Sequence, residues 1–217
     1  MGQIVVHTIP GSPFARSVFA TLEEKGIDYS LARITPGTLK QEPHIRRHPF
    51  GKMPVIEHDG FTLYETQAIL RYIDRMFPAP ALTPSDIKAA ARMDQLMNIS
   101  DQYLFQGVGN VIGFQRIVGP ALMGLTPDEA VIAAAMPQGH TVVRELEHLL
   151  GDQPFLSGDA LSLADLQVAP QLDFLVRTPE WEALRVDAPR LDAWLTRINA
   201  RPSMLATTWE KVSAMAA

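Results

Sequence analysis

The chain of 217 residues contains no cysteine. This absence excludes disulfide bonds, catalysis by a cysteine thiolate and any zinc site with cysteine ligands. A chain without cysteine also fits a reducing compartment, because thiols and disulfides play no part in its stability. We therefore expect a cytoplasmic protein.

Long apolar runs and an excess of positive charge are also missing. No apolar run approaches the roughly 18 residues that a membrane-spanning helix needs, and residues 1–4, Met-Gly-Gln-Ile, do not begin a secretory signal. Lys and Arg number 19 against 24 Asp and Glu, so the formal charge is −5. An acidic chain has no positive surface with which to bind a phosphate backbone. We expect neither a membrane nor a nucleic acid as partner.

The six histidines show no metal-binding pattern. His44 and His48 lie four residues apart, but Pro49 follows His48, and a helix seldom extends to the residue before a proline. Without a third ligand, we expect no metal site. A phosphate-binding glycine loop and the Gly-x-Ser-x-Gly turn of many serine hydrolases are absent as well.

The first third of the chain mixes strand and helix patterns. Apolar residues make up 47% of the sequence, which is typical of a soluble globular protein. The expected order is strand, helix, strand, short or irregular helix, hairpin and helix, in residues 4–7, 13–25, 29–34, 35–48, 53–64 and 65–77. Asp59-Gly60 is a strong hairpin signal. This order predicts a small mixed sheet with helices on its faces.

The rest of the chain shows only helix patterns. Pro-Ala-Pro at residues 78–80 breaks the last helix of the first part. Capping boxes predict helices beginning at Thr126 and Ser162, while the glycine-rich residues 107–124 are expected to be irregular. The predicted fold is an α+β domain at 1–77, a linker at 78–84 and an all-α domain at 85–217.

Two features of the first domain suit a small ligand. Glu65 and Thr66 would place a carboxylate, a hydroxyl and backbone N–H groups at a helix N-terminus. A free α-amino acid group needs an acceptor for its ammonium group and donors for its carboxylate, and Glu65 and Thr66 offer both. The two residues can equally be a plain helix cap. Pro54, at the start of a strand, either follows a cis peptide bond that leaves backbone groups free for a ligand or opens the strand in trans.

Several motifs together resemble the cytosolic glutathione transferases, most closely the serine-type phi and tau classes. Residues 12–16 (Ser-Pro-Phe-Ala-Arg), 50–55 (Phe-Gly-Lys-Met-Pro-Val) and 65–69 (Glu-Thr-Gln-Ala-Ile) resemble their N-terminal domain. Residues 119–129 and 155–165 resemble parts of their C-terminal domain. The resemblance implies a thioredoxin-like first domain, glutathione as co-substrate and a homodimer. Phe50 would then be either an aromatic residue that docks into the partner subunit or a buried residue of the monomer.

The resemblance implies that six residues bind glutathione: Ser12, Lys40, Lys52, Met53, Glu65 and Thr66. Glu65 and Thr66 would hold the γ-glutamyl end, and the main chain of Met53 would pair with the cysteinyl part. Both lysines would meet the glycine carboxylate, although each can equally be a solvated surface charge.

Ser12 is the candidate catalytic residue. Conjugation needs a thiolate, whereas a free thiol has a pKa of about 8.5. A hydrogen bond to a charged acceptor contributes roughly 1.5–3 kcal/mol, enough to lower this pKa by about one to two. Ser12 would thus donate its hydroxyl proton to the sulfur. Alternatively its hydroxyl only caps a helix, and Ser17, one turn deeper, is a second candidate donor.

An apolar pocket for the electrophile is expected between the domains. Its candidates are Phe14, Phe114 and Met123, each of which can also be a core residue. The resemblance implies a detoxifying transferase that adds the glutathione thiolate to small electrophiles and also reduces hydroperoxides. The alternatives are a glutathione-dependent isomerase, whose catalytic turn typically reads Ser-Ser-Cys, and a non-catalytic binding or adaptor protein.

Overall fold

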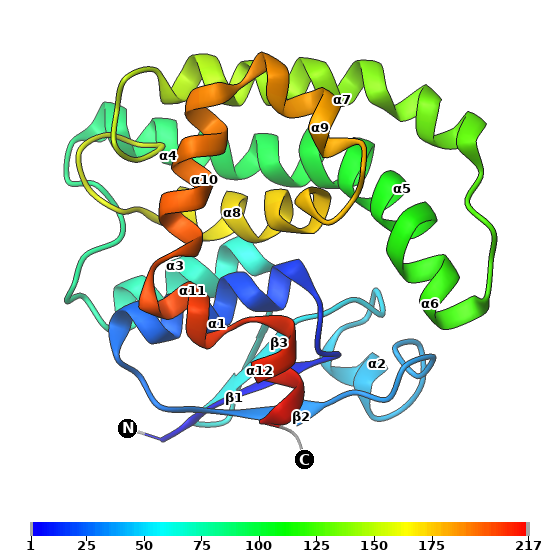
Figure 1. Ribbon diagram of the computed structural model, residues 1–217. Coiled ribbons are helices and arrows are strands. Elements are labelled where there is room, and N and C mark those ends of the chain that lie inside the picture. The colour runs from blue at the N-terminus through cyan, green and yellow to red at the C-terminus, as the bar shows by residue number, and fades with distance from the viewer. Residues whose placement is uncertain (1, 216–217) are drawn as a thin grey trace. The chain divides into compact units, whose positions relative to one another are not determined.

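The computed structural model describes residues 2–215 (Figure 1). The chain forms two compact units, of which unit 1 combines Met1–Leu82 with Ala200–Ala217 and unit 2 is Thr83–Asn199. The predicted linker, residues 78–84, contains the boundary between Leu82 and Thr83. The predicted helical domain, 85–217, differs at its end because residues from Ala200 onward pack with the N-terminal part of the chain.

Unit 1 contains a four-stranded mixed sheet in the order β2-β1-β3-β4. The strands are β1 Ile4–Thr8, β2 Tyr29–Arg33, β3 Val55–His58 and β4 Phe61–Tyr64. β1 is parallel to β2 and antiparallel to β3, which pairs antiparallel with β4. The φ angles of Asp59 and Gly60, 49° and 79°, are both positive, as the Asp-Gly hairpin signal predicts.

The helices of unit 1 are α1 Pro13–Lys25, α2 His44–Arg47, α3 Thr66–Met76, α11 Pro202–Ala206 and α12 Trp209–Ala214. The helix α1 begins after Ser12 and ends at Gly26, as predicted. α1 and α3 lie together on one side of the sheet (Figure 1). Val18 of α1, Ile69 of α3 and Ile56 of the sheet are all fully buried.

A buried ion pair joins α1 to α3. The Nζ atom of Lys25 lies 2.5 Å from Oδ1 of Asp74 and donates to the carbonyl of Phe77 at 2.7 Å. The same carboxylate oxygen accepts from the main-chain N–H of Leu82 at 2.9 Å. The ion pair therefore holds residues 77–82, which follow α3, against α1 and α3.

Lys25→Ala should lower the free energy of unfolding by about 3–5 kcal/mol, because it removes one partner of a buried ion pair. Urea unfolding followed by circular dichroism would measure the change. Arg75→Ala, at an exposed position one residue from Asp74, is the matched control and should change stability by less than about 0.5 kcal/mol. Equal effects of the two variants would contradict the structural role of Lys25.

Unit 2 is all-helical within its described residues. Its α-helices are α4 Ile87–Ile99, α5 Asn110–Gly113, α6 Gly119–Met123, α7 Glu129–Leu150, α8 Leu163–Val176, α9 Trp181–Leu184 and α10 Pro189–Asn199. Two π-helical segments, Ser100–Gly109 and Phe114–Val118, and the 3₁₀-helix Arg185–Asp187 complete it. No helix within residues 2–215 has the length and apolar character needed to cross a bilayer.

Two details of unit 2 differ from the sequence prediction. Residues 107–124 are largely helical rather than irregular, because glycines there allow close packing: a Cβ at Gly113 would collide with the ring of Phe174. The cap of α7 is Asp128, not Thr126, since Oδ1 of Asp128 accepts from the N–H of Ala130 at 3.0 Å. Asp is a stronger N-cap than Thr.

The capping box of α8 is confirmed. The Asp165 carboxylate accepts from the main-chain N–H and the hydroxyl of Ser162 at 2.9 and 2.8 Å. It also accepts from the N–H of Leu156 at 2.9 Å and from Nε1 of Trp194 at 3.0 Å. This fully buried side chain thus joins the loop before α8 to α10.

Candidate functional site

The strand register brings three chemically important segments to one end of the sheet. Val55 lies opposite Tyr64 in the hairpin, so the residues before β3 and those after β4 are neighbours. Val55 also lies opposite His7, which brings the end of β1 to the same place. Met53 precedes β3, Glu65 follows β4, and the turn after β1 leads to α1.

Ser12 is the N-cap of α1. Its Oγ accepts from the N–H of Ala15 at 3.3 Å, while its hydroxyl proton has no acceptor among residues 2–215. Ser17 instead donates its hydroxyl proton to the carbonyl of Pro13 at 3.2 Å. The cap uses only the lone pairs of Ser12, so capping a helix and donating to a ligand are compatible. Of the two candidate serines, only Ser12 keeps its proton available.

Met53 links the loop before β3 to the end of β1. The Met53–Pro54 peptide bond is cis, one of the two alternatives from the sequence. The sulfur of Met53 accepts from the N–H of Ile9 at 3.2 Å and from the hydroxyl of Thr8 at 3.4 Å. Within the described part of the chain, no hydrogen bond uses the Met53 main chain. Its N–H and carbonyl are therefore available to an extended ligand.

Glu65 has an unusual backbone conformation just before α3. Its φ of 69° is positive although it is not a glycine, a conformation that costs roughly 1–3 kcal/mol and is common at ligand sites. Its carbonyl accepts the first helical N–H, that of Ile69, but its side chain does not cap the helix and is exposed. Thr66, the first residue of α3, is buried. The plain-cap alternative therefore does not describe the Glu65 side chain.

The structure brings Lys40 beside the loop that carries Lys52. Gly51, which precedes Lys52, has a φ of 59°, and a Cβ there would lie 2.8 Å from Cγ of Lys40. Glycine therefore permits this close approach. The carbonyl of Lys52 accepts from Nε2 of His44 on α2 at 2.7 Å. Both lysine side chains are exposed.

His48 is a neighbour of this site that the sequence did not identify. Its ring is buried and lies 4.5 Å from that of Tyr64, measured between centroids. Burial lowers the pKa of His48, and the positive charge of Lys52 lowers it further, while Glu65 acts in the opposite direction. A neutral imidazole at neutral pH follows. From the sequence, His48 is notable only as a possible metal ligand four residues from His44. Its place beside Tyr64 depends on how α2 folds, which the spacing does not show.

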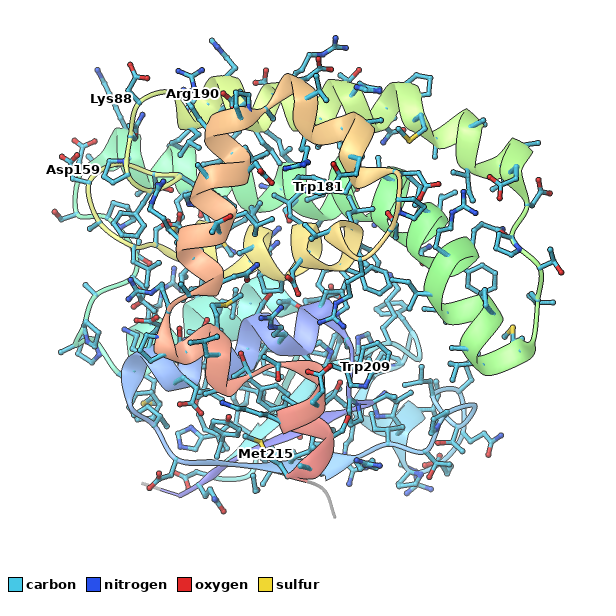
Figure 2. The ribbon with its side chains drawn as sticks, in the orientation of Figure 1. Lys88, Asp159, Trp181, Arg190, Trp209 and Met215 are labelled. Carbon is cyan, nitrogen blue, oxygen red and sulfur yellow. The ribbon has the colours of Figure 1, made fainter. Side chains whose placement is uncertain are left out.

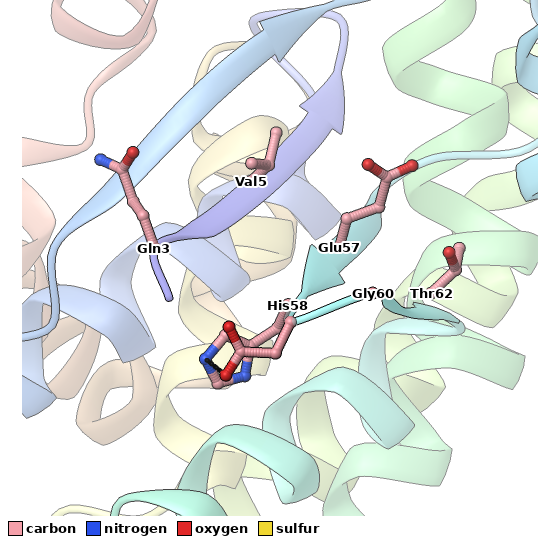
Figure 3. Close-up of a pocket in the computed structure, with 7 residues that line it drawn as sticks. Gln3, Val5, Glu57, His58, Gly60 and Thr62 are labelled. Atoms are coloured by element: carbon pink, nitrogen blue, oxygen red, sulfur yellow. Dashed lines mark ion pairs between the residues drawn. The ribbon is translucent and has the colours of Figure 1, made fainter. Parts of the chain in front are cut away.

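The cavity found in unit 1 lies elsewhere on the sheet. It has a volume of about 360 Å³ and is lined by Gln3, Val5, Glu57, His58, Asp59, Gly60 and Thr62 (Figure 3). None of the predicted site residues lines it. Within residues 2–215, no group of three or more histidine and acidic side chains could hold a metal ion.

The three candidates for the electrophile pocket belong to different units. Phe14 is a half-buried residue of α1 in unit 1, less buried than Val18 of the same stripe. Phe114, at the start of a π-helical segment, is half-buried, and Met123, at the end of α6, is 63% exposed; both are in unit 2. Their grouping into one pocket stays a prediction.

Known proteins similar to this chain agree with its motifs. The family models described as the N-terminal and C-terminal domains of glutathione S-transferase match residues 6–81 and 96–202. Glutathione S-transferase F7 of Arabidopsis thaliana is 32% identical over 94% of this chain and 98% of its own length. A glutathione S-transferase of Hyoscyamus muticus is 33% identical over 91% and 94% of the two chains.

Solved structures agree as well. Glutathione transferase F7 from Populus trichocarpa has a TM-score of 0.85 and 28% identity, with 98% of each chain covered. Glutathione S-transferase I from maize, in complex with an atrazine glutathione conjugate, has a TM-score of 0.83 and 28% identity over 99% and 98% of the chains. By sequence and by fold, this chain belongs to the glutathione transferase family, as a transferase of the phi class.

Proposed function

We propose that this transferase adds the thiolate of glutathione to small electrophilic compounds, at the end of the sheet where β1, β3 and β4 meet. The observation that supports the proposal is the strand register, which brings Met53 and Glu65 to the end of β1 from which the turn leads to Ser12. The solved maize relative holds a glutathione conjugate of atrazine, a product of this kind of reaction.

Each part of glutathione has a matching group in unit 1. The exposed Glu65 carboxylate accepts from the α-ammonium group, and the N-terminus of α3 suits the neighbouring carboxylate. The N–H and carbonyl of Met53 pair with the cysteinyl residue. Lys52 follows Gly51, which Lys40 approaches closely, and the charges of both lysines attract the glycine carboxylate.

Ser12 acts on the sulfur as a hydrogen-bond donor. Its proton stabilises the thiolate, and the N-terminus of α1 adds roughly 0.3–1 kcal/mol. The thiolate then forms a carbon–sulfur bond with the electrophile, and the leaving group departs with its electron pair. Serine is not the base, because its hydroxyl stays protonated at neutral pH. The same thiolate can attack the terminal peroxide oxygen of an organic hydroperoxide. The O–O bond then breaks, the alcohol leaves, and a second glutathione converts the resulting glutathione sulfenic acid to glutathione disulfide and water. Peroxidase activity is therefore the second reaction to assay.

Binding to immobilised glutathione, followed by an assay of thiol addition to a chromogenic aryl halide, tests the proposal. Retention on the column together with turnover supports a conjugating enzyme. Retention without turnover, on aryl halides and hydroperoxides alike, would favour a binding or adaptor protein. Failure to bind glutathione would refute the proposed site.

Glu65→Ala should weaken glutathione binding by about 10- to 150-fold, since a hydrogen bond to a charged group contributes roughly 1.5–3 kcal/mol. Calorimetric titration would measure the affinity. Glu42→Ala is the control: Glu42 is exposed, and among residues 2–215 its carboxylate pairs with Arg46 at 2.8 Å. Unaltered affinity in Glu65→Ala would contradict the γ-glutamyl role.

A homodimer is also proposed, because closed two-fold pairs are the commonest oligomers. Phe50 is 66% exposed, so it is not the buried monomer residue of the second alternative. Its ring meets those of His48 and Tyr64 edge-on, with centroids 6.1 and 6.4 Å away. Sedimentation equilibrium would decide whether the chain is a monomer or a dimer.

A further inference from the structure

The C-terminal segment, residues 200–215, is tied to α1. The guanidinium group of Arg201 donates to both oxygens of Glu24, at 2.7 and 2.8 Å, and the hydroxyl of Ser203 donates to Oε1 of Glu24 at 2.5 Å. Arg16, one turn after the N-cap of α1, donates from Nη2 to the carbonyl of Met204 at 3.2 Å. The segment is thus fixed along the helix that begins at Ser12.

A second set of contacts holds α12 near the end of β1. Nη2 of Arg33, the last residue of β2, donates to the carbonyl of Ser213 at 2.8 Å. Thr208 caps α12 by accepting from the N–H of Lys211 at 3.4 Å. Trp209, the first residue of α12, is labelled in Figure 2 and is 38% exposed.

The indole ring of Trp209 lies against the turn that precedes the catalytic serine. A Cβ at Gly11 would be 3.0 Å from Cε2 of this ring and 3.1 Å from Cδ2 and Cζ2. Gly11 also has a φ of 97°, which other residues rarely adopt. Both the backbone angle and the neighbouring ring therefore require glycine, and the ring closes over the flexible position next to Ser12.

We propose that Trp209 is a positioning residue, which holds the Gly11–Ser12 turn so that the Ser12 hydroxyl stays aimed at the sulfur of bound glutathione. This inference rests on the proposed function. The turn is confined by the indole ring at Gly11 and by the hydrogen bond from Ile9 to the Met53 sulfur. A hydrogen bond weakens steeply when its geometry is lost, so freedom at Gly11 reduces the stabilisation of the thiolate.

Trp209→Ala should raise the pKa of the enzyme-bound glutathione thiol by about 0.5–1, because part of a hydrogen bond of roughly 1.5–3 kcal/mol is lost. The rate of conjugation at neutral pH should fall about two- to eightfold, in proportion to the loss of thiolate. Affinity for glutathione at neutral pH should change by no more than about threefold, since Glu65 and the Met53 main chain are untouched. Trp209→Phe should largely restore the wild-type pKa.

The measurement is the ultraviolet absorbance of the glutathione thiolate, titrated against pH on the folded full chain. Leu205→Ala is the control, at an exposed position on α11 in the same segment. If Trp209→Ala does not fold, Arg33→Ala loosens α12 from β2 and should raise the same pKa by a smaller amount. An unchanged thiol pKa in the folded variants overturns the inference. A wild-type protein that does not bind glutathione, or binds it without lowering its thiol pKa, overturns the proposed function instead.

Discussion

Replacing Ser12 with alanine should abolish most of the thiolate absorbance of bound glutathione at neutral pH, while affinity stays within several-fold. Without the hydroxyl donor the thiol pKa returns from about 6.5–7.5 toward about 8.5, so the thiolate fraction at pH 7 falls by about 8- to 25-fold. The rate of conjugation should fall by a similar factor. Above this pKa both enzymes carry a thiolate, and the difference between them should narrow.

The controls for this prediction come from the same helix. Ser17→Ala removes a hydroxyl whose proton is already given to the carbonyl of Pro13, so its thiolate signal should match that of the wild type. Ser12→Thr keeps both a hydroxyl and an N-cap and should retain part of the signal. Loss of the cap in Ser12→Ala also costs about 1 kcal/mol of stability, so circular dichroism must confirm the fold. A thiolate signal that survives in folded Ser12→Ala would disprove the role of Ser12.

Asp165→Ala should produce the largest loss of stability among the variants described. The carboxylate accepts four hydrogen bonds, from Leu156, from Trp194 and twice from Ser162, and is fully buried. Each donor left unsatisfied costs about 1–3 kcal/mol, so the total reaches at least about 4 kcal/mol against a typical stability of 5–15 kcal/mol. Urea unfolding, or recovery of soluble protein on expression, would measure the loss.

Two variants test whether the carboxylate itself is required. Asp159→Ala removes an exposed carboxylate from the loop before α8 and should change stability by less than about 0.5 kcal/mol. Asp165→Asn keeps the size of the side chain, but its amide nitrogen faces donors that need an acceptor, so it should also be destabilised. A stability of Asp165→Ala within about 1 kcal/mol of the wild type would show that the network contributes little net free energy.

Local signals predicted much of unit 1. Ser12 and Gly26 bound α1, and the Asp59-Gly60 turn closes the hairpin, because caps and turns depend on residues next to one another. The placement of residues 200–215 was not predictable in this way. It depends on the contact of Arg201 with Glu24, which are 177 positions apart, and no periodic pattern records such a pair.

The candidate site also combines features that local sequence shows with features that depend on contacts between distant residues. Glu65 and Thr66 stand out in sequence because they begin a helix, and the turn before β3 stands out because of its proline. Lys40 meets Gly51 only because the long connection between β2 and α2 folds back, so the spacing of the lysines along the chain does not reveal it. The glycines of residues 107–124 led to a wrong prediction of irregular structure. A glycine that allows close packing within a helix, as Gly113 does against Phe174, looks the same in the sequence as a glycine in a loop.

Unit 1 is built from both ends of the chain, so its two parts are synthesised at different times. Unit 2 is continuous, so all of it is synthesised before Arg201, Trp209 and Ser213 are translated. Domains generally fold as units as they emerge. The nascent amino-terminal part therefore remains with Gly11 uncovered until residues 200–215 have been made and have emerged, so unit 2 can complete its fold before unit 1.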